Sequence, residues 1–166
     1  MRRFSLGFIL VGLALAGVLA AAPAGAMGQA AAQPRMYTSS EVALHSALRK
    51  LWEEHIVYTR TFIISALAGL PDTDSTAGRL LRNQDDLGAA IQPFYGDAAG
   101  AKLASLLRDH ILIAADIVKA AKAGDGEGVT KGQAAWHANA LDIASCLSAA
   151  NPNWSKDTLG KRYPWA

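Results

Sequence analysis

The sequence has a single cysteine, Cys146, and this scarcity removes several kinds of site at once. One thiol cannot form an intramolecular disulfide, and it cannot supply the paired cysteines of a redox motif, a zinc ribbon or a covalent haem attachment. Cys146 stands between Ile143 and Leu147 in an apolar stretch. We therefore interpret it as a small buried hydrophobe and not as a reactive group.

An excess of either charge is also missing once the N-terminus is set apart. The chain has 16 basic and 14 acidic side chains, and Arg2 and Arg3 account for the whole difference. The rest of the chain is formally neutral. We expect no nucleic-acid partner, because proteins that bind nucleic acid carry a clustered basic face.

Strand patterns and catalytic motifs are lacking as well. No stretch alternates apolar and polar residues for long enough to predict a β-strand, so the expected fold is all-α. There is no glycine-rich phosphate loop after a strand. Ser65, Ser105 and Ser145 fall within predicted helices and lack a nucleophile elbow, so the sequence predicts no catalytic residue.

The N-terminus has the pattern of an export signal. A positively charged start precedes an uncharged apolar run to Ala22, and small-residue cleavage sites follow at Ala24 and Ala26. Cleavage there predicts an exported domain in the periplasm or outside the cell. The alternative is an uncleaved anchor helix, because residues 4–26 are long enough to attach the chain to a membrane. We therefore assign residues 1–26 to a signal peptide or membrane anchor.

The next segments are a spacer and a helical domain. Residues 27–37 are rich in Ala, Gln and Pro without apolar periodicity, which indicates a flexible spacer. The helical domain is expected over residues 38–154. Its first helix begins at a capping box formed by Thr38 and Glu41 and ends at Gly69, which a proline follows closely.

Caps and helix breakers predict three further helices. Pro93 is expected to end the second helix, because proline lacks the amide proton that a helix needs and disfavours helix at the residue before it. Asp97 is expected to cap the third helix. The expected ranges are 72–75 to 92 for the second helix, 97 to 124 for the third and 129 to 151 for the fourth, with residues 94–96 in a turn.

One helical hairpin occurs twice in the chain. Residues of the first helix recur 55 positions later in the third, and residues of the second helix recur 56 positions later in the fourth. A doubled hairpin predicts a four-helix bundle with an approximate internal two-fold axis. The repeated residues are Leu51, Glu54, His55 and Ile56 with Leu106, Asp109, His110 and Ile111, and Leu80, Asn83, Asp86, Leu87 and Ile91 with Trp136, Asn139, Asp142, Ile143 and Leu147.

Polar side chains repeat at positions that face or adjoin the core. His55 and His110 fall on apolar stripes, where an imidazole is costly unless its nitrogen atoms are paired. Amide and carboxylate groups repeat with them, either three residues apart on one helix face or at a seam between helices. These groups are Glu54, Asn83, Asp86, Asp109, Asn139 and Asp142.

Two interpretations of the repeated histidines stay open. In the first, they form a hydrogen-bonded core network with the amides and carboxylates that fixes the register of the hairpins. In the second, His55 and His110 coordinate a transition metal or haem iron, and the carboxylates orient the rings. The di-iron pattern Glu-x-x-His is absent, because the acidic residue here directly precedes the histidine.

Much of the chain resembles a family of small bacterial helical proteins whose activity is unknown. The resemblance covers about residues 48–154 and is carried by LWEEHIVYTRTFIISALAGLPDT, LLRNQDDLGAAIQPFYGDAAG, LLRDHILIAADIVKAAKAGD and ALDIASCLSAANPNW. Members carry the automatic labels acetylglutamate kinase or glycosyltransferase. Those labels imply large α/β domains with nucleotide sites, whose motifs this sequence lacks. The resemblance implies no catalytic residues.

The resemblance also bears on the C-terminus. Similar proteins continue past the segment matched by Asn151 to Trp154 with further helices and another histidine or two, whereas this chain departs near Ser155. We therefore expect residues 155–166 to be a disordered or truncated tail. A surface left without its covering helix predicts a homo-oligomer.

These observations favour an exported, non-catalytic helical bundle with a binding or assembly role at the cell envelope. The first alternative is a bundle that binds a metal or haem through His55 and His110. The second is an enzyme of unknown reaction.

Overall fold

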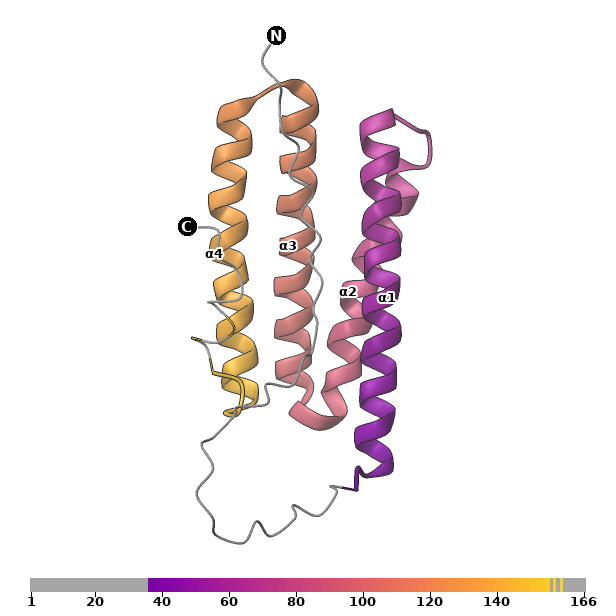
Figure 1. Cartoon of the computed structure of the whole chain (residues 1–166), viewed down its shortest axis with the longest axis vertical. Helices are drawn as coiled ribbons and strands as arrows, with labels where there is room; N and C mark the ends of the chain where they lie inside the picture. Colours follow the sequence, from indigo (N-terminus) through magenta and orange to yellow (C-terminus); the bar gives the residue numbers. More distant parts are fainter. Residues whose placement is uncertain (1–35, 156, 158, 160–166) are drawn as a thin grey trace, which may run out of the picture. The chain divides into compact units, whose positions relative to one another are not determined.

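The computed structural model describes residues 36–155, 157 and 159 and places four α-helices and no strand in them (Figure 1). These helices are α1 (Ser39–Ala68), α2 (Thr73–Tyr95), α3 (Asp97–Ala123) and α4 (Gly126–Ala150). The predicted all-α bundle is therefore confirmed. The expected leader, residues 1–26, lies outside the described residues, as do most of the spacer and residues 160–166 of the tail.

The ends of α1 are those that the sequence predicts. The Thr38 hydroxyl accepts a hydrogen bond from the Glu41 amide at 3.2 Å, and the Glu41 carboxylate accepts one from the Thr38 amide at 2.8 Å. This reciprocal pair satisfies two amides that no helical carbonyl can reach. Gly69 ends the helix with φ 66°, a left-handed conformation that side chains disfavour.

The end predicted for α2 is wrong. The helix continues through Pro93 to Tyr95 before Gly96 ends it. Pro93 lies in the last turn, so its missing amide proton removes only one helical hydrogen bond. The Gly96 amide donates to the Gln92 carbonyl at 2.8 Å and closes that turn. Residues 94 and 95 are thus helical.

Two N-caps also differ from the sequence prediction. Asp97 is the first residue of α3 and makes no capping bond, because Gly96 holds the cap position. Its carboxylate still lies at the positive end of the helix dipole. The fourth helix begins at Gly126, earlier than predicted, because the Asp125 carboxylate accepts from the Gly128 amide at 2.8 Å and starts a helix within the glycine-rich stretch.

The two central helices carry most of the core. Helix α2 packs against α1 and α3, and α3 packs against α2, α4 and, less extensively, α1 (Figure 1). Leu87 and Ile91 of α2 and Leu103 and Leu107 of α3 form the larger buried cluster. Half-buried apolar side chains of the outer helices cover it: Leu48, Leu51 and Trp52 from α1 and Ile143, Cys146 and Leu147 from α4.

The predicted internal two-fold axis is not fully realised. An axis that exchanges the hairpins would pack α4 on α1 as closely as α2 packs on α3. The structure has an extensive α2–α3 interface, but α1 and α4 share no comparable one. The described bundle is therefore open along the edge between α1 and α4, because the hairpins contact each other mainly through their inner helices.

Glycine permits the close approach of α2 and α3. A Cβ atom at Gly88 would lie 2.6 Å from both the Ala104 Cβ and the Gly100 carbonyl oxygen. Both distances are shorter than a van der Waals contact, so a side chain at this position forces the helices apart. Gly78 lies on the same helix, and a Cβ atom added there would meet nothing within 4 Å.

Replacing these two glycines by alanine should have opposite effects on stability. We expect Gly88→Ala to lower the free energy of unfolding by about 1–3 kcal/mol through overpacking. Gly78→Ala should raise it by about 0.5–1 kcal/mol through helix propensity. Urea unfolding followed by circular dichroism measures both changes. Equal effects of the two substitutions would show that α2 and α3 do not pack this closely.

Candidate functional site

The second hairpin shows the arrangement around its histidine most simply. The Asn139 side-chain amide donates to the Leu106 carbonyl at 3.1 Å, which leaves its oxygen facing the His110 ring. The Nδ1 of His110 donates to this oxygen at 2.7 Å. Trp136 completes the arrangement: its indole N–H donates to the His110 carbonyl at 3.1 Å, and its ring stacks on the imidazole at 4.5 Å.

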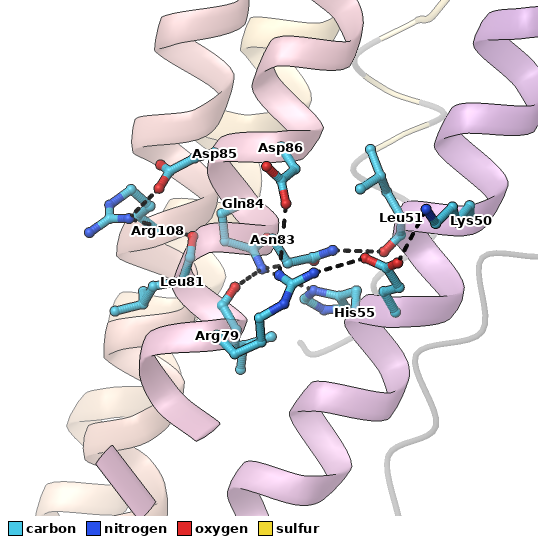
Figure 2. A network of polar contacts seen from close by, with 12 residues as sticks. Lys50, Leu51, His55, Arg79, Leu81, Asn83, Gln84, Asp85, Asp86 and Arg108 are labelled. Atoms are coloured by element: carbon cyan, nitrogen blue, oxygen red, sulfur yellow. Dashed lines mark hydrogen bonds and ion pairs between the residues drawn. The ribbon is translucent and has the colours of Figure 1, made fainter. Parts of the chain in front are cut away.

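The first hairpin repeats the asparagine bond (Figure 2). The Asn83 amide donates to the Leu51 carbonyl at 3.0 Å, as its repeat counterpart does to Leu106. The His55 Nδ1 lies 3.2 Å from the Gln84 Nε2, and Asn83 also bonds the ring. Gln84 further donates to the Leu80 carbonyl and to the Asn83 side-chain oxygen. In both hairpins one asparagine therefore ties a helix carbonyl to a histidine.

Gln84 is a member of this network that the sequence did not reveal. It is fully buried, with 0% of its surface exposed. The repeat selects residues present in both hairpins, and the residue that corresponds to Gln84 in α4 is Ala140. The role of Gln84 in the network is visible only in the packed structure, because nothing in its local sequence marks it as buried.

Burial lowers the pKa of both histidines. Desolvation is the main cause, since a charged imidazole loses water that the protein interior does not replace. The bonds from Asn83 to His55 and from Asn139 to His110 act in the opposite direction and are weaker. A charge on His110 lowers the pKa of His55 further. Both are neutral at pH 7.

The two rings use Nδ1 in opposite ways. The His55 Nδ1 must accept, because the Gln84 Nε2 is an amide nitrogen that can only donate. His110 must donate through Nδ1, because the Asn139 oxygen can only accept. A neutral imidazole protonated on Nδ1 keeps the lone pair of Nε2 available to accept a bond or to ligate a metal. His110 is thus compatible with a core network and with ligation through Nε2. A neutral His55 carries its proton on Nε2 and would have to change tautomer before that atom could bind a metal.

The repeated carboxylates take positions away from the rings. Asp86, Asp109 and Asp142 are exposed. Their carboxylates remain in water, since burial would cost them solvation without a pairing cation. Glu54 is half-buried at the helix seam, where it accepts from Arg79 at 3.1 Å. None of the four has a described bond to either histidine, so they do not orient the rings in the described structure.

Arg79 is a second residue that the sequence analysis missed. Its guanidinium bridges Glu54 and Asp86, the latter at 3.7 Å (Figure 2). It also lies 4.3 Å above the centre of the Tyr58 ring. These contacts join α1 to α2 beside the buried network. Arg79 therefore pairs with both of the repeated acidic residues of the first hairpin, Glu54 and Asp86.

The histidines that do not repeat lie elsewhere. His45 is exposed on α1. His137 is half-buried on α4, and its Nδ1 is buried without a hydrogen-bond partner. Within the described residues, no three histidine, cysteine or acidic side chains come together closely enough to hold a metal ion. A metal at His55 and His110 would therefore need its remaining ligands from water or from a macrocycle.

A membrane-spanning helix is not found in the part of the chain that the structure describes. Comparisons with protein-family models, curated proteins and solved structures found no match to the chain. The family resemblance thus stays a prediction.

The pKa values predict that acid weakens the fold. The unfolded chain takes up protons on its histidines near their ordinary pKa of about 6.5, whereas the folded chain resists them until a lower pH. More protons are then bound in the unfolded state, so stability falls as pH falls below about 6.5, by up to about 1.4 kcal/mol per pH unit for each histidine. Urea unfolding at pH 7 and pH 5 measures this loss.

Two variants assign the effect to the buried rings. His110→Asn keeps an amide donor near the position of Nδ1 but cannot titrate, so it should reduce the pH dependence by roughly half. His45→Gln removes an exposed histidine and should leave the dependence unchanged. An unaltered pH dependence in His110→Asn would show that the buried histidine is not its source.

Proposed function

We propose that the chain is an exported, non-catalytic helical bundle that acts by binding or assembly at the cell envelope. Export rests on the N-terminal sequence pattern described above. The absence of a catalytic role rests on the missing motifs. The binding role rests on the outer surface of α1.

The outer face of α1 supplies the observation that carries this proposal. Five large apolar residues on it are each about half exposed, and their spacing places them on one side of the helix. Soluble proteins seldom leave such a face uncovered unless it meets another surface. These residues are Val42, Ile56, Val57, Ile64 and Leu67, and they are called the α1 outer face below.

Photo-crosslinking in the cells that produce the protein tests this role. A photoreactive residue at Ile56 in the full chain should yield an adduct of discrete mass, because the α1 outer face contacts a partner. The matched control carries the same residue at Arg82, which is exposed on α2 outside this face. No discrete adduct from Ile56, or equal adducts from both positions, contradicts the binding role.

A metal- or haem-binding bundle is the second candidate function. One observation favours it: His110 donates through Nδ1 to an oxygen, so its neutral ring keeps the lone pair of Nε2. Oxygen acceptors on Nδ1 are typical of histidines that ligate metals through Nε2. Haem would supply the four equatorial nitrogen ligands that the described protein residues do not.

Elemental analysis of protein isolated from its own compartment tests this candidate. We expect stoichiometric metal, or a Soret band after haem addition, in the unchanged chain. The double variant His55→Ala/His110→Ala should lose the signal while keeping its helical circular dichroism, and His45→Ala/His137→Ala should retain it. A metal content that is the same in both double variants excludes the two repeated histidines as ligands.

A further inference from the structure

The α2–α3 interface provides a template for a second interface. The repeat maps α2 onto α4 with an offset of 56 residues and α3 onto α1 with an offset of 55. The faces through which α2 and α3 meet therefore have counterparts on α4 and α1. Within one chain these counterparts do not form a comparable interface.

Burial on α3 and α1 differs at equivalent positions. Ile111 of α3 is 8% exposed, whereas Ile56, the same residue type at the same repeat position on α1, is 52% exposed. Ile56 is therefore still apolar, although no described helix covers it as α2 covers Ile111. Two further pairs, buried on α3 and half-buried on α1, are Leu103 with Leu48 and Leu107 with Trp52.

Burial also differs between equivalent positions of α2 and α4. Leu141 of α4 is an apolar residue with 38% exposure at the position where α2 has Asp85. Asp85 faces α3 and accepts from Arg108 at 2.8 Å, so Leu141 marks the corresponding face of α4. Three pairs that are buried on α2 and half-buried on α4 are Leu80 with Trp136, Leu87 with Ile143, and Ile91 with Leu147.

We propose that α4 of one chain packs against α1 of a second copy in the way that α2 packs against α3 within the chain. This inference rests on the assembly role proposed above and names its partner. The contact joins two different faces, so each copy still offers a free α1 and a free α4. Assembly then continues as in a helical repeat array or closes into a ring.

The proposed contact differs from its template at the point of closest approach. Gly100 and Ala104 of α3 correspond to His45 and Arg49 of α1, which are larger. The Asp85–Arg108 ion pair corresponds to Leu141 and Glu53, so no ion pair is repeated there. The two helices must therefore lie farther apart than α2 and α3, with Leu141 against the aliphatic parts of α1 side chains.

Disulfide trapping between two single-cysteine chains tests the orientation. In full chains that carry Cys146→Ala, we would place one cysteine by Glu53→Cys and the other by Leu141→Cys, the counterparts of Arg108 and Asp85. Mixing chains of two sizes should give the mixed dimer about tenfold faster than a control mixture in which Arg82→Cys replaces Leu141→Cys, because the contact raises the local thiol concentration.

Light scattering of the chain with its natural Cys146 provides a second measurement that needs no new cysteine. Its mass should increase with concentration beyond that of a dimer. Ile56→Glu should reduce association, whereas Thr61→Glu, at an exposed polar position on the same helix, should not. The proposal is overturned if the chain is a monomer at all concentrations. It is also overturned if disulfides form fastest between identical variants, because that result marks a two-fold dimer.

The photo-crosslinking experiment separates this inference from the function on which it rests. An adduct between Ile56 and the same chain supports both. An adduct with a different protein keeps the binding role and overturns self-assembly through α4 and α1. No adduct overturns both.

Discussion

The hydrogen bonds of two buried asparagines are the constraint on which this structure depends. Asn83 and Asn139 each donate to a leucine carbonyl of the neighbouring helix, and each also bonds the histidine one turn further along that helix. A buried amide without these partners would cost about 1–3 kcal/mol, so each hairpin is favoured in the register that forms both bonds. Leucine packing alone would tolerate a shift of register far more easily.

The same constraint holds one half-buried imidazole in each hairpin. Desolvation lowers the pKa of both, and their mutual repulsion lowers that of His55 further. The network therefore holds the hairpins most firmly when the rings are uncharged. Because His110 donates through Nδ1, the bond that fixes its register also leaves Nε2 able to ligate a metal, so the structural and the metal-binding interpretations share this residue.

The duplicated hairpin explains both the core and the open edge. Joining two copies in one chain buries the inner faces of α2 and α3 and leaves equivalent apolar faces on α4 and α1 half covered. Two repeats supply one interface between hairpins, whereas repeat arrays gain stability from several. The outer helices are thus less buried because of their place in the order of the chain. Ile56 of α1 keeps the apolar character of its counterpart, whereas His45 and Arg49 are polar where α3 has small residues.

Local signals in the sequence determined the helical class, the capped ends of α1 and the repeat, since capping and periodicity act over a few residues. The tertiary structure decided the rest. Helix α2 runs through Pro93, since a proline in the last turn removes only one helical bond. Gln84 enters the network, Asp86, Asp109 and Asp142 stay in water, and the edge between α1 and α4 remains open. These outcomes depend on which helix faces pack together between helices that are distant in the chain. A sequence repeat shows which residues are equivalent, but it does not show which of them are buried.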